Sequence, residues 1–141
     1  MATRSRIGMV KSDGKIVSVY CHWDGYPSHV GKLLLENYNT PEKVAELLSH
    51  GSISSLYERI GEKHDFDMEQ RGPGKVCTFH HRDRGESLQI DEHKTQKELL
   101  EDLPRWEEYL YLFKDGKWRY TANTNKVNRL KPLTPAVCSR R

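Results

Sequence analysis

The chain has 141 residues, of which 35% are hydrophobic and 30% charged, and its formal net charge is +3. This length fits one domain with a single small hydrophobic core. No stretch is apolar for long enough to span a membrane, no apolar signal region follows the first residues, and the three cysteines are widely spaced without a CxxC pair. These features argue against a membrane protein, a disulfide framework and a structural zinc site. They predict a soluble, intracellular protein.

The first predicted element is a β-hairpin around Asp13 and Gly14. An Asp-Gly pair between β-prone segments is a strong hairpin signal, because both residues of a two-residue turn need positive φ. In such a turn Arg6 pairs with Cys21. The residues that this register places on one face are Ile7, Met9, Ser18, Tyr20 and His22.

Two helices are predicted next. The first runs from about Ser28 to Tyr38, where apolar residues recur at helical spacing. The second begins after an N-cap at Thr40, with Pro41 at its first position, and ends at Gly51.

The second half of the chain begins with a charged loop over residues 61–75 and a strand over 76–81. A helix is predicted after the capping box at 95–98, and a second Asp-Gly hairpin spans residues 108–121. Its register pairs Phe113 with Trp118 and Tyr111 with Tyr120. The aromatic residues that share its face are Tyr109, Tyr111, Phe113, Trp118 and Tyr120. Such a face either forms the core, which the few aliphatic residues favour, or stacks on single-stranded nucleic acid.

These elements predict a single α+β domain over residues 1–125, followed by a basic, proline-containing C-terminal tail over 126–141. The expected architecture is an antiparallel sheet of about five strands, built from the two Asp-Gly hairpins and a central strand, with helices packed mainly on one face.

The densest group of polar residues lies where the first hairpin meets the first helix. A helix start presents unpaired N–H groups to an anion, Lys32 adds positive charge, and Trp23 or Tyr26 could stack on a base. Alternatively, Ser28 only caps the helix and Trp23 belongs to the core. The candidate ligand-binding residues here are His22, Trp23, Asp24, Tyr26, Ser28, His29 and Lys32.

A second polar group follows the predicted strand over 76–81. Arg82 and Arg84 can each bind phosphate or carboxylate through two parallel hydrogen bonds, although Asp83 could instead neutralise them. Adjacent histidines on a strand point to opposite faces, so at most one of them joins a given site. The candidate ligand-binding residues here are His81, Arg82 and Arg84.

No catalytic residue, metal or other cofactor is predicted. Three short combinations of histidine and aspartate supply ligand types, but none has a diagnostic metal-site spacing, and no Walker loop, GxSxG or GxGxxG motif is present. Cys21 and Cys77 have the character of strand core residues rather than of nucleophiles.

The chain contains RSRI at 4–7, YCHWDGYPSHVGK at 20–32, LLENY at 34–38, ISSL at 53–56 and HRDRGE at 81–86. In this combination it resembles a family of small, largely uncharacterised proteins from tailed bacteriophages and some bacterial genomes. The likeness covers roughly residues 4 to 120. It implies an accessory phage protein in the cytoplasm of an infected bacterium, and it brings no established activity from which a catalytic residue could be carried over.

We therefore expect a non-enzymatic phage accessory protein that binds a phosphate-bearing ligand, either a nucleotide signal or a nucleic acid, and thereby counters a host defence. One alternative is a small phosphodiesterase or nuclease that uses His22, Asp24, His29 and His81. Another is a protein-binding inhibitor of a host enzyme. No membrane partner is expected, and formation of a homo-oligomer is left open.

Overall fold

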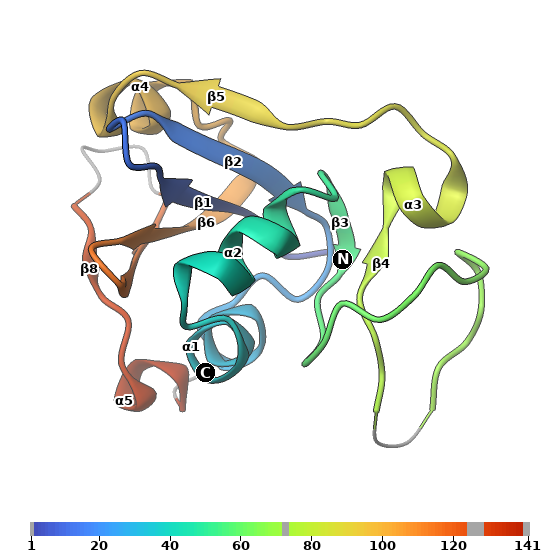
Figure 1. Cartoon of the computed structure of the whole chain (residues 1–141). Coiled ribbons are helices and arrows are strands. Elements are labelled where there is room, and N and C mark those ends of the chain that lie inside the picture. Colours follow the sequence, from blue (N-terminus) through green and yellow to red (C-terminus); the bar gives the residue numbers. More distant parts are fainter. Residues whose placement is uncertain (1, 72–73, 124–128, 140–141) are drawn as a thin grey trace.

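The computed structural model describes residues 2–71, 74–123 and 129–139 (Figure 1). The strands are β1 (Arg4–Val10), β2 (Ile16–Cys21), β3 (Ile53–Ser55), β4 (Thr78–Phe79), β5 (Asp91–His93), β6 (Glu107–Lys114), β7 (Lys117–Ala122) and β8 (Lys131–Pro132). The helices are the π-helix η1 (Pro27–Gly31), α1 (Lys32–Asn37), α2 (Pro41–Leu48), α3 (His80–Arg84), α4 (Gln96–Asp102) and α5 (Pro135–Cys138). None of these helices is long and apolar enough to cross a membrane.

The strands form one eight-stranded mixed sheet in the order β4-β3-β2-β1-β6-β7-β8, with β5 paired to the first half of β2. β1 and β6 are parallel, as are β2 and β3, and the other pairs are antiparallel. The α+β class is confirmed, but the prediction of about five antiparallel strands is wrong. Turn signals describe each hairpin by itself. They do not indicate that the hairpins join through the parallel pair β1–β6, and β3, β4, β5 and β8 are too short to show a pattern.

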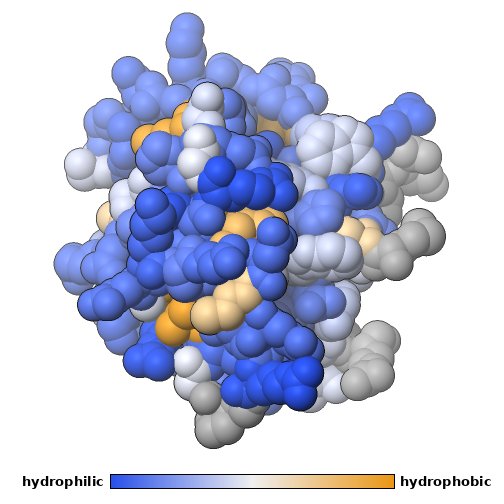
Figure 2. Space-filling view, turned by 90° about the vertical axis from the view of Figure 1, so that its right-hand side faces the viewer, coloured by the Kyte–Doolittle hydropathy of each residue, from blue (hydrophilic) through white to orange (hydrophobic). Residues whose placement is uncertain are grey.

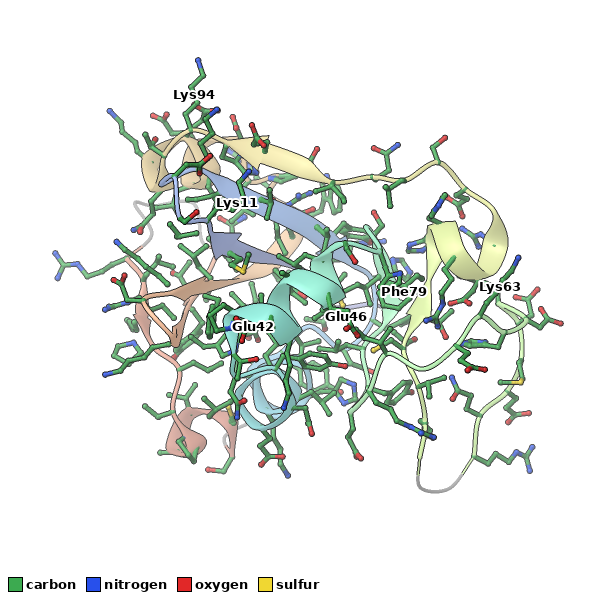
Figure 3. The ribbon with its side chains drawn as sticks, in the orientation of Figure 1. Lys11, Glu42, Glu46, Lys63, Phe79 and Lys94 are labelled. Atoms are coloured by element: carbon green, nitrogen blue, oxygen red, sulfur yellow. The ribbon has the colours of Figure 1, made fainter. Side chains whose placement is uncertain are left out.

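The two faces of the sheet are covered unequally. On one face, η1, α1, α2 and α5 pack over the larger core, and on the other α4 covers a smaller one (Figure 1). The exposed side of α2 carries Glu42 and Glu46 (Figure 3), while its apolar side packs on the sheet. The smaller core consists of Ile16, Leu99, Leu103, Leu110 and Leu112. Beyond α4, at the end where β1 begins, Arg4, Tyr20 and His22 on this second face are partly exposed, and Trp106 beside them is half exposed.

The β6–β7 hairpin has the predicted register, with Phe113 paired to Trp118. Asp115 and Gly116 have φ of 52° and 75°, as a two-residue turn with the twist of the flanking strands requires. The aromatic residues of this hairpin face the larger core, and Tyr111 and Trp118 are buried there.

The β1–β2 hairpin is shifted by one residue from the predicted register, because Arg6 pairs with Tyr20. Its loop closes between Lys11 and Lys15, where Lys11 N donates to Lys15 O at 2.8 Å, and in this loop only Gly14 has positive φ, at 85°. A shift of one residue moves every side chain of a strand to the other face. Tyr20 and His22 therefore lie on the opposite face from Ile7, which belongs to the larger core.

The predicted N-caps are confirmed for α2 and α4, where Thr40 and Thr95 accept hydrogen bonds from backbone amides. The segment near Ser28 differs, because it begins as η1 after Tyr26 and has no side-chain cap. The predicted strand over 76–81 is shorter in the structure: β4 ends at Phe79, and HRDRGE largely forms the helix α3 that begins directly after it. The C-terminal residues 131–138 contribute β8 and α5, while residues 124–128 and 140–141 lie outside the described part of the chain.

Candidate functional site

The turn that follows β2 is held in place by backbone contacts. Gly25 N donates to Thr3 O at 2.8 Å, and Tyr111 Oη donates to Gly25 O at 2.7 Å. A Cβ on Gly25 would lie 2.7 Å from the Ser5 side chain, so only glycine fits this approach. Asp24 takes φ of 56°, which aspartate tolerates better than most residues. This turn fixes His22 and Trp23 beside the start of β1.

Five side chains at this end of the sheet form what we call the open surface: Arg4, Tyr20, His22, Trp23 and Trp106. Successive ring centroids are 5.4 Å apart for Trp106 and Tyr20, 5.9 Å for Tyr20 and His22, and 4.7 Å for His22 and Trp23. Arg4 lies over the Trp106 ring, with Cζ 5.9 Å from its centroid. The shifted β1–β2 register is what brings Arg4, Tyr20 and His22 onto one face.

Both tryptophans of the open surface are unusually exposed, at 44% for Trp23 and 52% for Trp106. Two of their neighbours, Tyr20 and His22, are joined by a hydrogen bond. The Tyr20 hydroxyl lies 2.6 Å from His22 Nδ1. Burial raises the pKa of Tyr20, and the nearby Arg4 opposes part of that rise. If the hydroxyl donates to Nδ1, His22 Nε2 carries the ring hydrogen and is the donor that a ligand would meet.

Positive charge gathers around His22. Burial lowers the pKa of His22 below its usual value, and the nearby Arg4, His80 and Arg84 lower it further. Arg84 lies over the Phe66 ring, with Cζ 4.2 Å from its centroid, and pairs with Glu86. The open surface thus contains the β1 cation Arg4, and the α3 cation Arg84 lies near it.

The other residues of the first predicted group lie elsewhere. Ser28, His29 and Lys32 line a separate groove of about 570 Å³, together with Tyr57 and Lys75. The remaining lining residues are Leu33, Glu36, Asn37, Glu58 and Gly74. Two glutamates therefore offset the two lysines of this groove. The single predicted constellation is divided between the open surface and the groove.

Between these two places lies the Asp24–Tyr26 pair. Tyr26 Oη donates to Asp24 Oδ1 at 3.2 Å, and the Tyr26 ring lies 6.3 Å from that of His29. This pair supports the turn rather than adding positive charge.

Arg82 serves the fold rather than a ligand. Its guanidinium donates to Asp83 Oδ1 at 3.0 Å and to the carbonyls of Ile60, Gly61 and Cys77, and its side chain is only 12% exposed. Burial alone would raise the pKa of Asp83, but hydrogen bonds from Arg82 and from backbone amides lower it on balance. These contacts fasten the loop after β3 to α3. Phe79, on which Arg82 stacks, lies between α2 and α3 (Figure 3).

The outer side of the molecule near α3 is mainly hydrophilic. Figure 2 shows hydrophobic colour there only in small spots. His81 Nδ1 lies 2.6 Å from Glu86 O, so this histidine helps to close the end of α3.

The face covered by α4 contains a buried polar network that the sequence pattern does not predict. Arg6 binds the fully buried Glu107 through two hydrogen bonds of 2.7 and 2.9 Å, and it also contacts Asp91 and Ser18. Burial alone would lower the pKa of Arg6, but its two carboxylate partners raise it on balance. Only the pairing of distant strands brings these residues together.

The network continues from Ser18 to His93 and Asp102. Ser18 Oγ is 2.9 Å from His93 Nε2, and His93 Nδ1 is 3.2 Å from Asp102 Oδ2. This order resembles a Ser-His-Asp triad. However, Ser18 is fully buried and accepts a hydrogen bond from Arg6, so no substrate reaches its hydroxyl. The serine is part of the scaffold.

The predicted cysteine assignment agrees with burial of both thiols. Burial raises the pKa of Cys21 to about 12 and also raises that of Cys77, which disfavours thiolate chemistry. His22, Asp24, His29 and His81 are each bound to a different neighbour. Within the described ranges, the residues whose ligand atoms converge are instead His93, Glu98 and Asp102.

Comparisons of the chain with protein-family models, with curated proteins and with solved structures find no match.

Proposed function

We propose that the open surface binds single-stranded nucleic acid. The observation that carries this proposal is the row of rings Trp106, Tyr20, His22 and Trp23 beside the Arg4 guanidinium. Of the two ligands expected from the sequence, a nucleotide signal or a nucleic acid, we keep the nucleic acid. Arg4, Tyr20 and Trp106 are added to the binding residues, and they are not among those predicted from the sequence.

Stacking supports a nucleic acid with unpaired bases. A tryptophan that is half exposed offers ring area to a base, and base–aromatic stacking contributes about 1–3 kcal/mol per base. Trp23 and Trp106 lie at the two ends of the row, so two bases of one strand could each meet a ring. Paired bases in a duplex do not present their faces in this way.

Charge supports a phosphate backbone. Arg4 lies within the row, and Arg84 lies close enough to His22 to lower its pKa. When the Tyr20 hydroxyl donates to Nδ1, His22 Nε2 adds a further donor. Because Arg84 already pairs with Glu86, we assign the larger share of phosphate binding to Arg4.

The same geometry disfavours the other expectations. Small-molecule sites usually bury most of their ligand, whereas the open surface lies on an exposed face. The nuclease alternative needs convergent catalytic groups, and its four candidates are held apart by separate partners. In the setting that the phage-family resemblance implies, binding of single strands would act inside an infected cell and could shield them from a host defence.

Fluorescence anisotropy tests the proposal with labelled single-stranded DNA and RNA, duplex DNA, and mono-, di- and cyclic nucleotides as competitors. We expect single strands to bind best and their affinity to fall with salt, since bound phosphates release counterions. Arg4→Ala should weaken binding and lower the salt slope by about one. Lys117→Ala, an exposed cation on β7 at the other end of the sheet, is the matched control and should bind as the unaltered protein does.

Failure of every single strand to bind would refute the proposal. Equal losses in Arg4→Ala and Lys117→Ala would also refute it, because binding would then depend on overall charge and not on the open surface.

A further inference from the structure

The end of β5 and the exposed side of α4 bring together three metal-ligand types. His93 is the last residue of β5, and Glu98 and Asp102 lie four residues apart on α4, which places them on one face of the helix. One ligand atom from each residue lies within 4.8 Å of the others. We propose that His93, Glu98 and Asp102 bind a divalent first-row transition metal such as Zn²⁺.

The hydrogen bonds of the buried histidine support this assignment. Ser18 Oγ has two lone pairs, so it can accept from both Arg6 Nη1 at 3.0 Å and His93 Nε2 at 2.9 Å. In that tautomer the lone pair of Nδ1 faces the carboxylate of Asp102 at 3.2 Å. Either a proton on Nδ1 or a metal ion can lie between these two atoms, and a metal there leaves Nε2–H to donate to Ser18.

The partners of His93 match the way proteins orient metal-bound histidines. The second ring nitrogen of such a histidine usually donates to an oxygen that fixes the ring. Here Ser18 provides that oxygen, and Arg6 holds Ser18 in turn. His93 is only 5% exposed, so its ring is fixed before any ion arrives.

Room and charge around the three ligands also suit a cation. A cavity of about 310 Å³ lies beside them and is lined by His93 and Asp102, which leaves space for water to complete the coordination. Arg6 also lines this cavity, but Glu107 and Asp91 already pair with it. The lining residues are Arg6, Asp91, Glu92, His93, Leu99, Asp102, Leu103 and Pro104.

The donor set selects the class of metal. Imidazole nitrogen combined with carboxylate oxygen suits Zn²⁺ and neighbouring transition metals, whereas Mg²⁺ and Ca²⁺ prefer oxygen alone. Glu98 and Asp102 follow His93 by five and nine residues, which is not the spacing of a known metal motif, and Ser18, which orients the ring, comes from a distant strand. This explains why the sequence pattern does not predict the site.

Isothermal titration calorimetry of chelator-treated protein with Zn²⁺, and with Mg²⁺ in parallel, tests the site. We expect one Zn²⁺ per chain and no comparable uptake of Mg²⁺. Glu98→Gln and Asp102→Asn keep the size of the side chain, and each should weaken Zn²⁺ binding by about tenfold or more, as even outer-shell changes do. Glu101→Gln, an exposed residue of the same helix with the same change of charge, should leave binding unaltered.

Zn²⁺ can also bind histidines and cysteines elsewhere, so the variants decide the outcome. Equal Zn²⁺ affinity in Glu98→Gln, Asp102→Asn and the unaltered protein would refute the site, as would absence of uptake. The absorption spectrum with Co²⁺ provides a second readout: the proposal predicts no thiolate-to-cobalt charge-transfer band, and such a band would assign the metal to cysteine instead.

Discussion

Two groups of aromatic residues lie on this sheet, and they differ in what their polar atoms do. In the larger core, Tyr111 Oη donates to Gly25 O, and Trp118 Nε1 donates to Tyr38 O at 2.8 Å. Both side chains are buried, and both of these hydrogen bonds run inward. On the open surface, Trp23 and Trp106 expose about half of their area, and the polar atoms between them belong to Arg4, Tyr20 and His22.

Aromatic content by itself therefore does not indicate a binding platform. The ladder on β6 and β7 has the residue types of a base-stacking sheet, yet η1, α1 and α5 cover it. The open surface has fewer rings, but it combines exposure with cations. We therefore expect substitutions in the ladder to change stability, and substitutions on the open surface to change binding.

We expect the greatest loss of stability from a substitution in the larger core. Trp118→Ala should lower the free energy of unfolding by about 3–5 kcal/mol, because it leaves a cavity and an unpaired Tyr38 carbonyl. Urea unfolding followed by circular dichroism measures this loss. A loss below about 1 kcal/mol would contradict the assignment of Trp118 to the core.

An effect of similar size is expected in the buried network. Arg6→Ala leaves the fully buried Glu107 carboxylate without its partner, which should cost about 3–5 kcal/mol of stability. Asp91→Asn, at the half-exposed end of the same network, should cost less than about 1 kcal/mol. The same urea experiment compares them, and equal losses would show that Glu107 is not the critical partner.

On the open surface the expected changes concern binding. Trp106→Ala should weaken single-strand binding by about tenfold, since one stacked base contributes about 1–3 kcal/mol. Its free energy of unfolding should change by about 0.5 kcal/mol or less. Leu88→Ala, another exposed hydrophobic residue, is the control for anisotropy titrations and should bind normally. Unchanged binding by Trp106→Ala would remove Trp106 from the site.

The smallest expected effect is a pH dependence with opposite signs for stability and binding. Burial lowers the pKa of His22 in the folded protein, so below about pH 6.5 protons bind the unfolded chain more readily. The stability that the neutral ring contributes above this pH is therefore lost as pH falls. A bound phosphate favours the charged ring, so affinity for single strands should rise as pH falls below about 6.5.

His50 provides the matched control for this pH dependence. Burial lowers its pKa as well, with Arg82 as a further cause, but it packs against Phe79 and away from the open surface. His22→Gln should flatten the pH profiles of stability and of binding, whereas His50→Gln should alter only that of stability. If His50→Gln removed the pH dependence of binding, the result would contradict the role of His22.

Local signals in the sequence predicted the local structure of this protein well. Thr40 and Thr95 cap helices as expected, and Asp115 and Gly116 form the predicted two-residue turn. The prediction was wrong at the first hairpin, where the same Asp-Gly pair forms a longer loop. Turn type depends on how the flanking strands twist against their neighbours, which the dipeptide does not encode.

That one-residue shift explains most of what the sequence could not predict about the site. It moves Tyr20 and His22 to the face of Arg4, and the parallel pairing of β1 with β6 adds Trp106 from a distant segment. Nothing near Trp106 in the chain marks it as a site residue. Trp23 and His22 were predicted because polar and aromatic residues cluster where β2 ends.

We infer that the two exposed tryptophans bind single-stranded nucleic acid and that the buried one does not. The chain has three tryptophans, so 5-fluorotryptophan labelling gives an internal comparison by ¹⁹F NMR, with signals assigned through single Trp→Phe variants. We predict that a short single-stranded oligonucleotide shifts the signals of Trp23 and Trp106 and leaves that of Trp118 unchanged. Binding that perturbs neither Trp23 nor Trp106, or that shifts Trp118 alone, would contradict the claim.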